Sequence, residues 1–107
     1  MRSILLVLLL ACAGTAGAAP GDDAYARAVD EYEACHYRHA MAELRGAAEA
    51  GHGPAAQMLG TMLMLGPALY GDQVARNTAE GLRWLRASAS TGNEVARFQL
   101  VRLSKDH

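Results

Sequence analysis

The stretch AMAELRGAAEAGHGPAAQMLG, residues 40–60, predicts two helices joined by a tight glycine corner. Ala40 and Leu44 recur at helical spacing ahead of Gly51, and glycine is the residue that most often ends a helix. Pro54 then opens the second helix, because the missing N–H of proline costs nothing in a first helical turn. No sustained alternation of β-branched residues predicts a strand anywhere in the chain.

The same corner returns in GLRWLRASASTGNEVARFQLV, residues 81–101, where Gly92 takes the place of Gly51. Apolar residues share the offset between these two glycines in five pairs, which are Met41/Leu82, Leu44/Leu85, Ala48/Ala89, Ala55/Ala96 and Leu59/Leu100. The repeat predicts an all-α fold, a short α-solenoid of antiparallel helix pairs. We expect Gly51 and Gly92 to have positive φ, and Gly53, as an N-cap, to tolerate alanine or serine.

The resulting helices are short. We expect five of them, at residues 23–35, 38–50, 54–65, 78–91 and 94–104. Between the third and the fourth, residues 66–76 form the longest irregular stretch. Asn77 and Glu80 have the spacing of a capping box, in which each side chain bonds the backbone of the other residue.

This pattern resembles the Sel1-like repeat, a longer relative of the tetratricopeptide repeat. The residues that carry the resemblance are Ala48, Gly51, Ala55, Leu59, Gly60, Trp84, Leu85, Ala89, Gly92, Ala96 and Leu100. The departures are Glu43 at a tryptophan position, Ser88 at an alanine position and Val101 where Gly60 predicts glycine. The resemblance covers residues 25–103. It implies about two repeats and an extra half in residues 19–107, and a concave surface that binds another protein or peptide.

Residues 1–18 have the layout of a secretory signal peptide, with one early positive charge, an apolar run and then small residues. We expect cleavage before Ala19, which gives an exported, periplasmic or secreted protein without a transmembrane segment. The alternative is a lipobox that ends at Cys12 and would anchor the chain through lipid as an envelope lipoprotein. In either case Cys35 has no disulfide partner within the mature chain.

Charge and composition argue against several functions. The net charge of −1 gives no basic excess to attract nucleic acid. Cys35-His36-x-x-His39 offers metal-binding side chains, but the fourth ligand is missing and a helix starting near Arg38 would spread the histidines. We therefore interpret them as polar residues of a bend and expect no metal or cofactor. Three methionines at helical spacing are better explained as core residues than as a copper site, and they are Met58, Met62 and Met64.

An enzyme has little support in the sequence. The residues Ser88, Ser90, His52 and Asp72 cannot be assembled into a triad by spacing. Some Sel1-like proteins have been described as hydrolases, but no residue here transfers that activity. The sequence favours a non-catalytic adaptor.

The fifth helix has no following helix to pair with. It should pack on the fourth through Ala96, Leu100 and Leu103, which leaves Phe98 and Val101 as candidate partner-binding residues. A second copy of the chain could also occupy this face. The alternative is that Phe98 folds over the third helix and belongs to the core.

Overall fold

The computed structural model describes residues 19–105, and this part of the chain is all-helical, without a strand. It contains six α-helices and one 3₁₀ helix, which are α2 (Asp22–Glu33), α3 (Tyr37–Glu49), α4 (Gly53–Leu65), α5 (Pro67–Tyr70), η1 (Gly71–Gln73), α6 (Thr78–Ser90) and α7 (Glu94–Lys105). The all-α prediction is confirmed, and the long helices begin and end close to the expected bounds.

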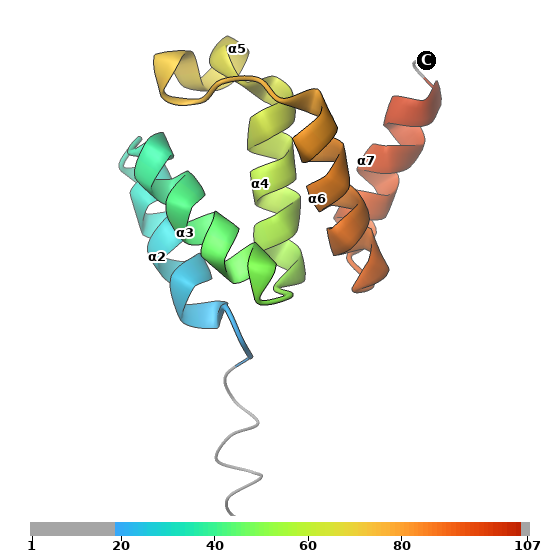
Figure 1. Ribbon diagram of the computed structural model, residues 1–107, viewed down its shortest axis with the longest axis horizontal. Helices are drawn as coiled ribbons and strands as arrows, with labels where there is room; N and C mark the ends of the chain where they lie inside the picture. The colour runs from blue at the N-terminus through green and yellow to red at the C-terminus, as the bar shows by residue number, and fades with distance from the viewer. Residues whose placement is uncertain (1–18, 106–107) are drawn as a thin grey trace, which may run out of the picture.

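The long helices pack in the order in which the chain visits them. Helix α2 packs on α3, α3 on α4, α4 on α6 and α6 on α7, and the segment with α5 lies over the upper ends of the long helices in Figure 1. Small and aliphatic side chains fill the main core, with Leu44, Leu59 and Met62 fully buried among alanines. Alanine permits close helix packing, so small side chains make up most of this core, and Tyr70 is its one buried aromatic residue among the described residues.

The two glycine corners have the same geometry. Gly51 has φ of 92° and Gly92 has φ of 95°, so the predicted left-handed conformation at both is confirmed. One residue later, the His52 N–H donates to the Ala47 carbonyl at 3.1 Å, and the Asn93 N–H donates to the Ser88 carbonyl at 3.3 Å. The first residues of α3 and α6, the helices before the corners, are as far apart in the sequence as the two glycines are. The first residues of α4 and α7, the helices after the corners, have the same separation. The sequence repeat is therefore a repeat of local structure.

The start of α4 differs from its prediction at Gly53. The N-cap is His52, whose Nδ1 accepts the Ala55 N–H at 3.1 Å, and Gly53 is the first helical residue. Gly53 is buried, and a Cβ there would collide with Oγ1 of Thr91. The Gly53 carbonyl also accepts a 2.6 Å hydrogen bond from the buried Ser88 hydroxyl. The expectation that Gly53 is the N-cap is therefore wrong, and a side chain at this position would require Thr91, the residue after α6, to move.

The segment between α4 and α6 is more ordered than its sequence predicts. It contains α5 and η1, and Val74 after them is 1% exposed. Tyr70 anchors α5, because its hydroxyl lies 2.9 Å from that of Tyr32 and its ring packs edge-on against Tyr37. Burial and the Tyr32 hydroxyl raise the pKa of Tyr70. The inserted segment is thus tied to α2 and α3, at the other end of the row from α7.

Glu80 forms only half of the predicted capping box. The Glu80 N–H donates to Oδ1 of Asn77 at 3.1 Å, as expected. The Glu80 carboxylate does not return to Asn77, because it accepts hydrogen bonds from Arg45 of α3 and from the indole N–H of Trp84. The ion pair with Arg45 therefore joins α6 to α3 across the row.

Candidate functional site

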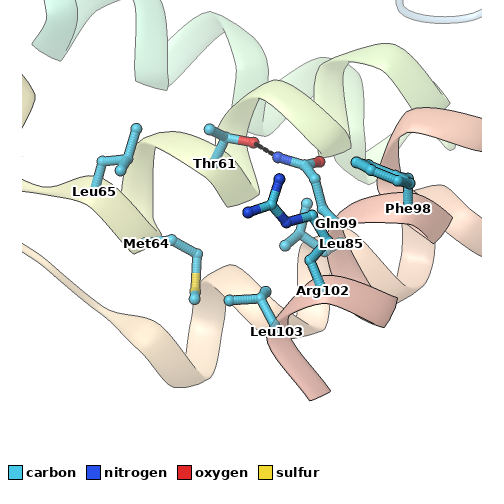
Figure 2. A pocket seen from close by; sticks show the side chains of 8 residues that line it. All are labelled: Thr61, Met64, Leu65, Leu85, Phe98, Gln99, Arg102 and Leu103. Atoms are coloured by element: carbon cyan, nitrogen blue, oxygen red, sulfur yellow. Dashed lines mark hydrogen bonds between the residues drawn. The ribbon is translucent and has the colours of Figure 1, made fainter. Parts of the chain in front are cut away.

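An apolar groove opens between α4 and α7, and we call it the C-terminal groove. It has a volume of about 370 Å³, and Figure 2 shows the eight side chains that line it. Its lining residues are Thr61, Met64 and Leu65 of α4, Leu85 of α6, and Phe98, Gln99, Arg102 and Leu103 of α7. The groove follows from the direction of α7, which leaves the Gly92 corner beside α6 and leans away toward its C-terminal end (Figure 1).

Three polar side chains hold α7 to α4 at the groove, of which Thr61 and Gln99 line it. Gln99 Nε2 donates to Oγ1 of Thr61 at 2.9 Å, and Gln57 Nε2 donates to Oε1 of Gln99 at 2.9 Å. Thr61 Oγ1 in turn donates to the backbone carbonyl of Gln57 at 2.9 Å. Because these groups bond one another, the polar atoms at this crossing are satisfied. The remaining lining side chains, apart from Arg102, are apolar.

Large apolar side chains are exposed around the groove. Phe98 is 62% exposed and Leu65 is 39% exposed, although both line it. Val95 and Val101 are 57% and 53% exposed on α7 but do not line the groove. Arg102 places its guanidinium carbon 6.0 Å from the centre of the Phe98 ring. This end of the row therefore combines an apolar surface with a cation at its edge.

The exposure of α7 follows from its place in the repeat. Val101 is equivalent to Gly60 of α4, because the same offset relates Gly92 to Gly51. Gly60 faces Gly81 of α6, where α4 and α6 approach too closely for a side chain. Within residues 19–105 no helix follows α7, so Val101 has no corresponding neighbour.

The two predicted partner-binding residues lie on the same exposed helix but only one lines the groove. Phe98 borders it, whereas Val101 lies on the outer side of α7. The alternative in which Phe98 joins the core is wrong, because most of its surface is exposed. Sequence reasoning missed Thr61, Leu65 and Gln99, since their proximity depends on the angle of α7.

The repeat positions fall into three groups by exposure. The buried ones are Ala48, Ala55, Leu59, Gly60, Leu85 and Ala96. Trp84, Ala89 and Leu100 are half-buried. The corner glycines Gly51 and Gly92 are exposed. Their role is to adopt a positive φ, which requires no contact with the core.

Charge is unevenly distributed along the row. Residues 61–105 carry six basic and three acidic side chains, whereas residues 19–60 carry three basic and seven acidic ones. In α6 and α7 the basic side chains are Arg83, Arg86, Arg97, Arg102 and Lys105. Their acidic neighbours Glu80 and Glu94 already pair with Arg45 and Arg97. The C-terminal groove thus lies in the basic half of the molecule.

A second group of chemically reactive side chains lies at the bend between α2 and α3. His36 Nδ1 is 2.9 Å from Oε2 of Glu31, and His39 Nδ1 is 3.7 Å from the same oxygen. The expectation that α3 spreads the histidines is wrong, since their ring centres are 6.1 Å apart. Cys35 is exposed, and its sulfur accepts a hydrogen bond from Tyr37 at 3.4 Å. Glu31 is the member of this group that the sequence did not indicate.

Two residues that were weighed for a catalytic triad, Ser88 and His52, are engaged in structural contacts. Ser88 donates to Gly53, while His52 bonds Asp22 through Nε2 at 2.9 Å and the Ala55 N–H through Nδ1. Both nitrogens of His52 are therefore occupied. Of the three methionines, Met62 is buried, and Met58 and Met64 are half-buried.

The predicted signal peptide and Cys12 lie outside the described residues. Among residues 19–105, no helix combines the length and the apolar character that crossing a bilayer requires. No protein-family model matches the chain, and no curated protein or solved structure matches it significantly.

Proposed function

We propose that this protein is an exported, non-catalytic adaptor that binds an acidic amphipathic segment of another protein in the C-terminal groove. The observation that carries the proposal is the exposed apolar surface of α7, with Phe98 62% exposed beside an apolar groove. Contiguous exposed apolar surface on a small protein is a common mark of an interaction site. Phe98 is suited to be the anchor, because aromatic side chains in pockets contribute much of the energy of protein interfaces.

The architecture supports an adaptor. The chain contains two helix–glycine–helix units that share their corner hydrogen bonds and the spacing of their helices. A short α-solenoid of Sel1-like repeats would contain such units. In such arrays each repeat contacts its neighbours, and the terminal repeat usually has a polar outer face. The apolar face of α7 departs from that rule, and a bound partner would cover it.

Charge favours an acidic partner. Arg102 lines the groove, and Lys105 lies on the same helix. A partner helix with aliphatic residues on one face and carboxylates at its edges would bury the first against Phe98 and pair the second with these cations. Complementary charge of this kind chiefly sets specificity and the association rate.

The position of Val101 favours the groove over a simple extension of the array. At the equivalent position of α4, Gly60 lets α6 approach so closely that a Cβ would collide with it. The side chain of Val101 keeps an added helix further from α7. A second copy of this chain would meet the same obstacle, so we favour a different protein as the partner.

The experiment that tests the proposal places a photoreactive phenylalanine analogue at position 98 and, as a matched control, at position 69. Leu69 is 58% exposed but lies on α5 and does not line the groove. A protein cross-linked from position 98 and not from position 69 is then purified, and its affinity is measured by fluorescence anisotropy. Phe98→Asp and Leu65→Asp should weaken binding at least about tenfold, as expected for an interface anchor, and Leu69→Asp should not.

Two results would contradict the proposal. One is equal cross-linking from positions 98 and 69, and the other is an unchanged affinity in Phe98→Asp. Circular dichroism of each variant separates lost binding from lost folding. Rising salt should also weaken binding, because the Arg102 side of the groove is exposed to solvent.

A further inference from the structure

The bend between α2 and α3 brings together two imidazoles and one carboxylate. We propose that Glu31, His36 and His39 bind a divalent transition-metal ion of the zinc class, and we call them the histidine cluster. Imidazole and carboxylate are the ligands that Zn²⁺ accepts alongside thiolate, and three protein ligands with an open fourth position form a common zinc arrangement.

The distances are close to those of a metal site. Glu31 Oε2 lies 2.9 Å from His36 Nδ1 and 3.7 Å from His39 Nδ1, and each residue offers a ligand atom within 4.8 Å of the others. Ligand atoms around a tetrahedral zinc ion are about 3.4 Å apart, given zinc–nitrogen bonds of about 2.0–2.1 Å. The side chain of His39 is 79% exposed, so its ring is free to turn by the small amount required.

The His36 ring does not make the capping hydrogen bond that a side chain at the N-cap position often makes. His36 is the N-cap of α3 but makes no capping hydrogen bond through its side chain. The residues at the three corresponding N-caps all do so, and they are His52 of α4, Asn77 of α6 and Asn93 before α7. His52 proves that an imidazole can perform this task here.

Gln73 of η1 replaces His36 as the cap of α3. Its Oε1 accepts the N–H groups of Tyr37 and Arg38 at 3.0 and 3.4 Å, and its Nε2 donates to the Cys35 carbonyl at 3.0 Å. Gln73, from the segment between α4 and α6, therefore accepts the free N–H groups at the start of α3. The His36 ring lies beside Glu31 and His39 instead. This arrangement leaves both histidines available to a ligand.

The surroundings favour a cation. A hollow of about 380 Å³ adjoins the cluster and is lined by Glu31 and His39 together with Arg27, Asp30, Ala42 and Glu43. Its three carboxylates outnumber its one guanidinium, which pairs with Glu43 at 3.1 Å. A cation bound by the cluster would thus meet a negative field, and water from the hollow would complete its coordination.

The test is calorimetric titration of Zn²⁺ into tag-free, chelator-treated exported chain. We expect one Zn²⁺ per chain, and at least about tenfold weaker binding in Glu31→Gln, His36→Gln and His39→Gln, since even outer-shell partners of a metal contribute that much. The matched control is Glu49→Gln, an exposed carboxylate of α3 outside the cluster, which should bind like the wild type. Binding that is unsaturable, or unchanged in His36→Gln, would overturn the proposal.

A second measurement uses the wild-type chain and does not depend on how the variants fold. Diethyl pyrocarbonate modifies accessible imidazoles, and mass spectrometry locates the modified residues. Saturating Zn²⁺ should protect His36 and His39 and leave the modification of His52, which is outside the cluster, unchanged. Equal modification of His36 with and without Zn²⁺ would show that the cluster is only a hydrogen-bonded bend. Neither result bears on the C-terminal groove, which uses none of these residues.

Discussion

Gly60 of α4 and Gly81 of α6 face each other so closely that a Cβ on Gly60 would lie 2.8 Å from the Gly81 carbonyl oxygen. It would also lie 2.9 Å from Cγ of the buried Leu85. Gly60→Ala should therefore destabilise the protein by about 1–3 kcal/mol, the usual cost of overpacking. Urea unfolding followed by circular dichroism measures the change.

Gly46 provides the matched control, because it is a glycine within a helix that has open space around it. A Cβ at Gly46 would meet nothing within 4 Å. Gly46→Ala in α3 should stabilise the protein by about 0.5–1 kcal/mol, since alanine loses less backbone freedom on folding. If both substitutions change stability in the same direction, the close approach of α4 and α6 is not the reason for Gly60.

The corner at residues 51–53 yields a second prediction. Gly51→Ala should cost about 1–2 kcal/mol from its positive φ alone, because its Cβ would enter open space. Gly53→Ala should cost a comparable amount for a different reason, the collision with the Thr91 side chain. Adding Thr91→Ala should then rescue Gly53→Ala and not Gly51→Ala in a double-mutant cycle. Additive losses at residues 53 and 91 would contradict this.

The Glu80 carboxylate gives the stability a pH dependence. The hydrogen bond from Arg45, assisted by that from Trp84, lowers the pKa of Glu80 below its ordinary value of 4.5. A group whose pKa is lower in the folded state stabilises above its unfolded pKa, and the contribution is lost as the pH falls through the folded pKa. Wild type should therefore lose more stability than Glu80→Gln between neutral pH and about pH 3. Parallel losses in urea unfolding would show that the Arg45 contact contributes nothing.

Processing of the chain before Ala19 would create a new ion pair. The Ala19 nitrogen donates to Oδ2 of Asp22 at 2.8 Å, and this hydrogen bond, with a further one from His52, lowers the pKa of Asp22. Cleavage turns that nitrogen into an ammonium group, so a chain starting at Ala19 should have a higher melting temperature than its N-acetylated form. Asp22→Asn should remove the difference.

The mass of the exported protein tests the processing step itself. We expect an unmodified chain that begins at Ala19. A diacylated chain that begins at Cys12 would establish the lipoprotein alternative. In that case the Ala19 nitrogen stays an amide and the predicted ion pair does not form.

The helices and their glycine corners could be predicted because they depend on local sequence. Gly51 and Gly92 each follow an apolar helical run, and a positive φ at that position needs no distant partner. Contacts between segments were harder to predict. Thr91 lies next to Gly53 only because α6 packs on α4, and the sequence alone does not give that register.

The candidate sites show the same division. The sequence indicated Phe98 and Val101 as candidates for exposure but left open whether Phe98 joins the core, and the structure shows both exposed. The groove could not, because it depends on the angle of α7. The two histidines were visible in the sequence, but Glu31 joins them through a turn in which Cys35 takes φ of 63°, an unusual value for a residue other than glycine.

The place of α7 at the end of the row has a kinetic consequence. Helix α7 packs mainly on α6, whereas α4 and α6 each lie between two long helices. Local unfolding starts where the fewest contacts break, so backbone amides of α7 should exchange with deuterium faster than those of α4. The helix that carries Phe98 is then also the segment that opens most easily. A ligand in the groove would slow that exchange, so the exchange rate of the α7 amides would show whether the groove is occupied.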